Sequence, residues 1–470
     1  MEPRVLPKTL DYTDVLPLAV ESRSRRRTFF PINGQTFSSG GANIIRIDLS
    51  ADALLDTQHS YLRFNFTPRV RTAGIDFAGG HSFIRRLRVE QSGVVLEDIN
   101  SYNRLMGAVV LPCQSGEDHH NERSITEGQR VASQLGAYTA TLTQAGQFDA
   151  VAVSAGSAMD VGGARNNTST QIAVGGTYVF TIPLNSGILN NEKLIPLMLM
   201  SAPLTIEIEL EDSVRACCWA TDATGTYDID NVRYIANLIE VGQDVSGQLR
   251  MVQEMSGGVL TLAGQTYRHF TGLVSAGSGD QIVNVPARVK SMKSLFFATQ
   301  GTGSAGTSGA DAQSYDIGTG GNMKLNEFQL KIGSVVYPPT PVRCGFGTGV
   351  AGTNGTGHVR GEALLELAKA WGNVGSTKGL GQLSALNYAT TEQIRSLTNG
   401  LKTFAPFGLD LEAFQRVAIE SGVNTADRSL PISLVLNFAN APTLAQNIDV
   451  YVLADALFYI NGDGSMSVSV

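Results

Sequence analysis

Alternating apolar and polar residues run through most of this chain and predict β-strands. In residues 62–66 and 204–210 every second position is apolar, and the positions between them are Arg, Asn, Thr or Glu. Because successive side chains of a strand point to opposite faces, this pattern buries one face and leaves the other in water. Strands of this kind form antiparallel sandwiches, so we expect an all-β fold.

Two other kinds of segment lie between the strands. Four segments have the residue spacing of amphipathic helices: 98–109, 122–134, 362–371 and 391–402. Three others are rich in Gly, Ser, Thr and Asn: 154–177, 301–322 and 345–358. Loops of such length usually form a functional surface. We therefore expect short inserted helices, and long loops on an outward end or rim.

The strand-like segments occur twice in the same order. Four pairs of segments align, namely 28–47 with 266–285, 84–96 with 325–337, 204–210 with 430–436, and 231–236 with 449–454. Three apolar positions are expected to superpose between the copies: Ile44 on Ile282, Leu87 on Phe328, and Ile206 on Ile432. The offset changes between pairs, as loop insertions on a duplicated scaffold would cause. We expect a duplicated β-sandwich, with two unrelated β-domains as the alternative.

The length of 470 residues accommodates two such modules. A polar stretch with several glycines, residues 242–264, is the best boundary between them. The expected organisation is an N-terminal basic arm at 1–27, a first sandwich at 28–241, a linker at 242–264, and a second sandwich with a C-terminal tail at 265–470.

Composition and charge exclude several classes of protein. No apolar run approaches the roughly 18 residues that span a bilayer. The first residues carry Pro3, Pro7, Asp11 and Asp14 where a secretory signal needs a continuous apolar stretch. The net charge of −7 argues against nucleic-acid binding over a whole face. The four cysteines are scattered and form no disulfide or zinc pattern, so we expect reduced thiols.

Two motifs suggest a metal site and a dinucleotide-binding site. Neither motif has the surrounding sequence that such a site requires. Residues 117–120 read Glu-Asp-His-His, but adjacent side chains rarely reach one metal ion, and a hydrated loop is the better interpretation. Residues 301–306 fit G-x-G-x-x-G, yet no apolar helical repeat comes after them as a dinucleotide site requires. We therefore predict no catalytic, cofactor-binding or metal-binding residues and no enzymatic activity.

The run of arginines before the first strand is the one candidate site. Arg23, Arg25, Arg26 and Arg27 fill four of five positions and repel one another unless an anionic partner neutralises them. Such a run is either an ordinary solvated tail or an arm that contacts nucleic acid, anionic lipid or an acidic neighbour.

Several local sequences are similar to those of one viral family. Residues 79–87, which read GGHSFIRRL, and 96–105, which read LEDINSYNRL, look like a strand pair that runs into a short helix. Residues 194–197, LIPL, precede the strand at 204–210 in a similar way. With the duplication, these segments resemble the double jelly-roll major capsid proteins of double-stranded DNA viruses, of the polinton-like virus and virophage type.

The resemblance implies a fold and a function. The fold would be two tandem eight-stranded antiparallel jelly-roll sandwiches. The protein would be a structural subunit whose pseudo-hexameric homotrimers tile an icosahedral virion shell, assembled inside the host cell. Its partners would be neighbouring capsomers and minor or penton capsid proteins. The basic arm at Arg23, Arg25, Arg26 and Arg27 would face another capsomer or the interior, where a membrane or the genome lies. We expect no long extra C-terminal domain of the kind that larger family members have.

Two other functions remain open from the residues alone. A β-sandwich carbohydrate-active enzyme should show clustered aromatic platforms for sugars, but the two tryptophans, Trp219 and Trp371, lie in separate modules. A carbohydrate-binding protein or adhesin would suit the long loops, but it predicts an export signal that the sequence does not show.

Overall fold

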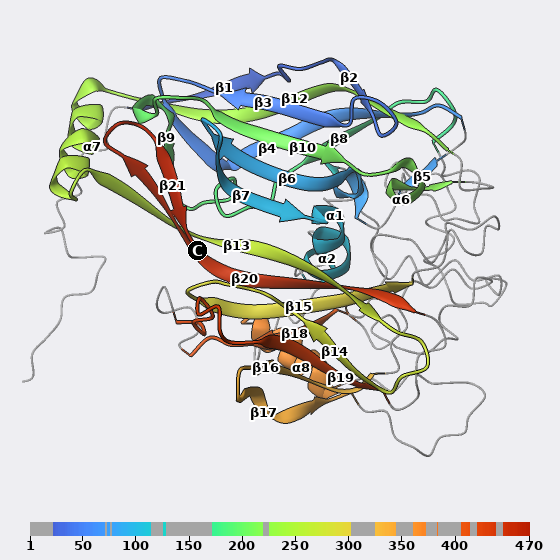
Figure 1. Ribbon diagram of the computed structural model, residues 1–470. Coiled ribbons are helices and arrows are strands. Elements are labelled where there is room, and N and C mark those ends of the chain that lie inside the picture. Colours follow the sequence, from blue (N-terminus) through green and yellow to red (C-terminus); the bar gives the residue numbers. More distant parts are fainter. Residues whose placement is uncertain are drawn as a thin grey trace, which may run out of the picture.

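The computed structural model describes residues 22–70, 73–75, 78–113, 126–127, 172–219, 225–301, 325–344, 361–372, 383, 406–413, 421–438 and 445–470. These residues form two β-sandwich modules, the first in the upper half of Figure 1 and the second in the lower half. The predicted all-β class is therefore confirmed. None of the helices among the described residues is long and apolar enough to cross a membrane.

The first module consists of two facing antiparallel sheets. The β1 sheet contains, in spatial order, β1 (Ser22–Phe29), β12 (Tyr227–Val241), β4 (Leu54–Pro68) and β8 (Tyr178–Ile182). The β3 sheet contains β3 (Ile44–Leu49), β10 (Leu204–Leu210), β6 (Ile84–Gln91) and β7 (Val94–Asn100). Four short strands complete the module: β2 (Thr36–Ser38), β5 (Ala73–Ile75), β9 (Ile195–Pro196) and β11 (Cys217–Trp219).

The second module repeats this arrangement. The β13 sheet contains β13 (Val259–Val274), β20 (Gln446–Asn461), β15 (Met292–Gly301) and β18 (Phe407–Asp410), and β21 (Met466–Ser469) pairs with β20. The β14 sheet contains β14 (Asp280–Asn284), β19 (Ile432–Phe438), β16 (Leu325–Ile332) and β17 (Val335–Arg343).

Strand order is the same in both modules, which confirms the duplication predicted from the sequence. Each of the eight main strands of the first module has a counterpart in chain order, so β1 corresponds to β13, β3 to β14, and β12 to β20. The register of the β3–β10 pair in the first module also agrees with that of the β14–β19 pair in the second. Ile47 pairs with Ile206 in the first module, and the Val285 N–H donates to the Ile432 carbonyl in the second. The three pairs expected to superpose lie on corresponding strands.

Helices are short and few among the described residues. α8 (Gly361–Ala370) confirms the helix predicted at 362–371, whereas the segments 391–402 and, apart from Thr126 and Glu127, 122–134 lie outside the described residues. The helix predicted at 98–109 begins later than expected. β7 continues to Asn100, which pairs with Arg86, and the helical turns α1 (Tyr102–Arg104), η3 (Leu105–Val110) and α2 (Leu111–Cys113) come next. Hairpin pairing therefore overrides local helical spacing at Asp98.

The expected linker is not an irregular segment. Residues 242–264 contain α7 (Gln243–Met255) and the first residues of β13, which begins at Val259. α7 stands at the left margin of Figure 1, beside the first module, and β13 leads from it toward the second module. The chain thus passes from one module to the other through a helix.

The β13 sheet is buried on both of its faces. On one face Phe297 and Val450 belong to the core of the second module. On the other face Phe296 and Tyr451 belong to a core that is continuous with the first module. A strand covered on both faces needs no polar alternation, and β20 accordingly has nine consecutive buried residues after Asn447. The two modules therefore bury apolar side chains against each other in one continuous core.

Candidate functional site

The arginine run predicted as a site lies in a strand. Arg23, Arg25, Arg26 and Arg27 are part of β1, which pairs with β12 from Ser22 to Phe29. This differs from a separate arm that ends at residue 27, because β12 extends to Val241 and offers backbone partners to the whole run. All four side chains are exposed. Figure 1 shows β1 at the top edge, on the far side of the first module from the second.

Contacts of these arginines are few and solvent-exposed. Arg25 Nη1 lies 3.1 Å from Glu240 Oε1. The guanidinium carbons of Arg26 and Arg27 lie 5.9 Å and 4.9 Å from the ring centroids of Tyr61 and Phe29. Exposed ion pairs and cation–π contacts of this kind contribute little stability. β1 is therefore a basic edge strand with charge available to a partner.

A buried ion-pair network joins the two modules. Arg104 on α1 is 5% exposed, and its Nε lies 3.2 Å from Asp449 Oδ2 on β20. Asp449 Oδ1 lies 2.9 Å from His269 Nε2 on β13. Burial alone would raise the pKa of Asp449, but the hydrogen bond with His269 and the charge of Arg104 outweigh it and hold the pKa below its ordinary value. Asp449 is thus held as a carboxylate between the modules.

A second buried carboxylate, Glu97 on β7, receives hydrogen bonds from both modules. Its Oε1 accepts from the Gly187 N–H at 2.9 Å and from the Thr266 hydroxyl at 2.7 Å. Burial raises the pKa of Glu97, and these two bonds act in the opposite direction. Gly187 lies in the segment after β8, and Thr266 lies on β13 of the second module. Glu97 therefore connects both of them to β7.

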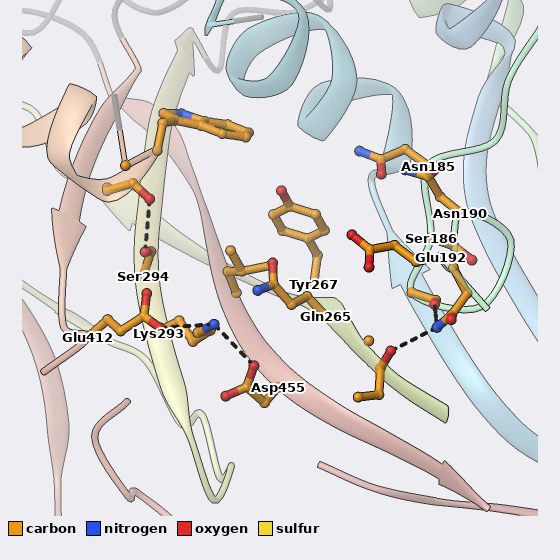
Figure 2. Close-up of a pocket in the computed structure, with 18 of the residues that line it drawn as sticks. Asn185, Ser186, Asn190, Glu192, Gln265, Tyr267, Lys293, Ser294, Glu412 and Asp455 are labelled. Atoms are coloured by element: carbon orange, nitrogen blue, oxygen red, sulfur yellow. Dashed lines mark hydrogen bonds and ion pairs between the residues drawn. The ribbon is translucent and has the colours of Figure 1, made fainter. Parts of the chain in front are cut away.

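A polar cleft of about 690 Å³ opens beside this contact (Figure 2). Asn185, Ser186 and Asn190 of the first module line one side, and Lys293 of the second module lies on the opposite side. Lys293 Nζ is 3.0 Å from Glu412 Oε1 and 3.4 Å from Asp455 Oδ1. The cation is therefore already neutralised by its own module. The lining of the cleft also contains Glu192, Lys193 and Lys369, so it carries charges of both signs.

No group of His, Cys, Asp and Glu among the described residues could hold a metal ion. Residues 117–120 and 302–306, where the sequence suggested weak metal and dinucleotide motifs, lie outside the described ranges. The rings of Trp371 and Phe296 pack in a tilted arrangement with centroids 5.0 Å apart, so this tryptophan packs on the β13 sheet. Of the predicted loops, only residues 172–177 and Gly301 are described.

Comparison with known proteins bears on the fold. No protein-family model matches the sequence, and no curated protein sequence matches it. Solved structures do match over nearly the whole chain. A model of the PBCV-1 virus capsid aligns with a TM-score of 0.57 at 11% identity, covering 98% of this chain and 99% of that one. This chain has the double jelly-roll fold.

Two further double jelly-roll structures are about as similar. The Faustovirus major capsid protein aligns with a TM-score of 0.57 at 9% identity, covering 97% of this chain and 92% of that chain. A chain of the Sputnik virophage aligns with a TM-score of 0.55 at 11% identity, covering 100% and 93%. At such low identity the match shows the fold alone, and it confirms the tandem jelly rolls expected from the sequence.

The residues that join the two jelly rolls were not predicted from the sequence. Arg104, Asp449 and Glu97 are charged, and charged residues normally lie at the surface. One signal was present in the sequence for Asp449, because it begins the apolar run 449–454 that lacks polar alternation. A charge at the head of such a run requires a buried partner.

Proposed function

We propose that this protein is a major capsid protein, a non-enzymatic structural subunit of an icosahedral virion shell. The observation that carries the proposal is the tandem pair of jelly rolls, fixed to each other through a shared apolar sheet. Solved structures of the same fold, matched over nearly their full length, include the Faustovirus major capsid protein and the PBCV-1 virus capsid. A shell subunit also requires no catalytic constellation.

Homotrimers are the assembly that the duplication favours. Three chains contribute six similar modules, which gives a near-hexagonal tile able to pack with six neighbours. Within one chain the outer face of the β13 sheet is covered by the first module. The corresponding face of the β1 sheet is not covered by the second module in this chain. A neighbouring copy would cover it in a closed ring of modules.

Residues on that uncovered face support this assembly. Arg63 on β4 pairs directly with Arg233 on β12, whereas the corresponding strands of the second module pair Phe296 with Tyr451. Arg233 Nε is buried and has no hydrogen-bond partner among the described residues. Like charges opposite each other destabilise a sheet unless something neutralises them. A carboxylate of a neighbouring copy would do so.

Light scattering coupled to size-exclusion chromatography tests the assembly. We expect a species of about 150 kDa, three times the chain mass of 50.0 kDa. A monomer at micromolar concentration would contradict the trimer and favour a carbohydrate-binding protein or adhesin. Electron microscopy of the expressed protein, or of particles from its source, tests the shell directly.

The basic strand would act between trimers or on the layer beneath the shell. Its exposed arginines can bind an acidic neighbour, anionic lipid or nucleic-acid phosphate. Minor and penton capsid proteins are further partners under this proposal. The virion capsid, assembled inside the host cell, is the proposed location.

A further inference from the structure

An apolar groove of about 520 Å³ lies beside α7, and Lys193 lines both this groove and the polar cleft. Its lining includes six apolar side chains from four parts of the chain: Leu54, Leu194, Pro196, Leu249, Val252 and Leu260. Leu249 and Val252 are three residues apart on α7, so they lie on one face of the helix. The opposite wall comes from the starts of β4 and β13 and from the segment around β9.

The helix leaves unusually large apolar side chains in water. Val252 is 49% exposed, and on the neighbouring surface of α7 Met251 and Met255 are 60% and 86% exposed. A contiguous apolar patch with this exposure on a folded chain marks a binding surface. Nine of the twelve residues that line the groove are apolar, which favours an apolar ligand.

The chain itself supplies a suitable ligand close to the groove. The described chain begins at Ser22, which pairs with Val241, two residues before α7. Ser24 pairs with Ile239, and Ile239 pairs with Leu54 of the groove. Because adjacent strands are about 4.8 Å apart, Ser24 lies roughly 10 Å from Leu54.

The residues just before this point are apolar. Residues 15–20 read Val-Leu-Pro-Leu-Ala-Val and contain no charge, while Asp14 and Glu21 border them. Pro17 disfavours a helical conformation of the residue before it, so the run favours an extended form. Six extended residues span about 20 Å, which is enough to reach the groove from Ser22.

We propose that residues 15–20 bind in this groove of the same chain, as an apolar strap from β1 across α7. The strap covers Val252 and fixes α7 against the starts of β4 and β13. Lys193, which also lines the groove, lies where a carboxylate bordering the run can approach it. The strap does not depend on capsid assembly, since every group that it uses belongs to one chain.

Thiol labelling of the full-length chain tests the proposal. Leu18→Cys is expected to react with a maleimide about tenfold or more slowly than Val5→Cys, because burial of a leucine-sized side chain shifts an equilibrium by at least that factor. Val5 lies in the same segment outside the apolar run. The unsubstituted chain gives the background from its native cysteines, of which Cys113, Cys217 and Cys344 are buried.

Substitutions in the groove locate the binding surface. Val252→Asp should bring the labelling rate of Leu18→Cys up to that of Val5→Cys. Met255→Asp, on the same helix but outside the groove, should leave it slow. If Val252→Asp disturbs α7, the reciprocal pair of substitutions decides. Leu18→Asp changes no residue of the described sheets and should accelerate labelling of Val252→Cys about tenfold.

Three results would overturn the strap. Equal labelling rates for Leu18→Cys and Val5→Cys would show no binding. A Leu18→Cys, Val252→Cys pair that oxidises to covalent dimers, and not to a monomer with an internal bond, would show exchange between copies. Slow labelling that appears only with phosphatidylcholine–phosphatidylglycerol vesicles would assign the apolar run to a membrane.

Discussion

Gly187 of the first module and Gly264 of the second approach so closely that a Cβ atom on Gly264 would lie 2.8 Å from the Gly187 carbonyl oxygen. In turn, a Cβ on Gly187 would lie 2.6 Å from the Gln265 carbonyl oxygen. The two modules therefore meet backbone to backbone at the edge of the polar cleft, where neither glycine can carry a side chain without movement of a main chain.

Gly264→Ala is expected to destabilise the protein by about 1–3 kcal/mol, because the added methyl group must push backbone and not a flexible side chain. Gly247→Ala provides the control: it lies within α7 with nothing inside 4 Å, and it should stabilise by about 0.5–1 kcal/mol. Urea unfolding measures both. A Gly264→Ala variant as stable as the parent would contradict the close approach.

Arg104→Met should cost about 3–5 kcal/mol in unfolding free energy, since it leaves the buried Asp449 carboxylate without its guanidinium. Arg25→Met removes a pair whose side chains are 64% and 39% exposed, and it should cost about 0–1 kcal/mol. In the double variant Arg104→Met, Asp449→Asn, part of the larger loss should return. A double variant as unstable as the sum of its single variants would show that the two side chains do not interact.

The pKa of Asp449 gives the pH dependence a definite sign. In the folded chain its pKa lies below the ordinary 3.8, so the folded state binds this proton less readily than the unfolded state. Its ionised form therefore stabilises the fold above pH 3.8, and the contribution is lost as pH falls through the folded pKa. The stability difference between the parent and Asp449→Asn should be constant above about pH 5 and shrink below about pH 4. Urea unfolding across this range would contradict the assignment if the difference grew on acidification.

Arg233→Glu should weaken the proposed trimer about 30-fold or more, because charge reversal at a buried interfacial group costs at least about 2 kcal/mol. Arg85→Glu is the control, on β6 of the other sheet, with a side chain 59% exposed beside Glu209. Light scattering over a dilution series gives both dissociation constants. Equal weakening by the two substitutions would remove the β1 sheet as the subunit contact.

Replacement of Arg23, Arg25, Arg26 and Arg27 by Ser should leave folding and trimer formation unchanged but lower the yield of particles. The arginines of β1 are exposed and are not part of a hydrophobic core, and their proposed anionic partner lies outside the trimer. Assembly of the parent should also weaken as salt is raised, since screening shortens the range of these charges. Particle counts by electron microscopy at two salt concentrations test this. Unchanged yield in the Ser variant would show an inert strand end.

Much of this architecture could be predicted from sequence because alternation reports directly on a half-buried sheet. The pattern at 204–210 identified β10, and its repeat at 430–436 identified β19 together with the duplication. Strand ends were harder. Asp98 has helical spacing to the residues after it, but it lies in β7, where it forms two hydrogen bonds with Arg86 of β6.

The contacts between the modules could not be predicted from local pattern. Arg104 and Asp449 are 345 residues apart, and each read alone is an ordinary surface charge. The arginines of β1 showed no strand pattern because this half of the strand is exposed on both faces. The pairing of β1 depends on the length of β12, which lies more than 200 residues later in the sequence.

In the β13 sheet, the face covered by the first module is a contact within one polypeptide. Joining two copies in one polypeptide makes one of two equivalent contacts permanent, and it removes the entropic cost of association there. That contact is apolar, and it buries Phe296 and Tyr451 within a single chain. Under the proposed assembly, the corresponding face of the β1 sheet carries Arg63 and Arg233, which are charged and can stay in water until a neighbouring copy covers them. Under the proposed assembly, the contact within the chain is therefore permanent and the contact between chains can be reversible.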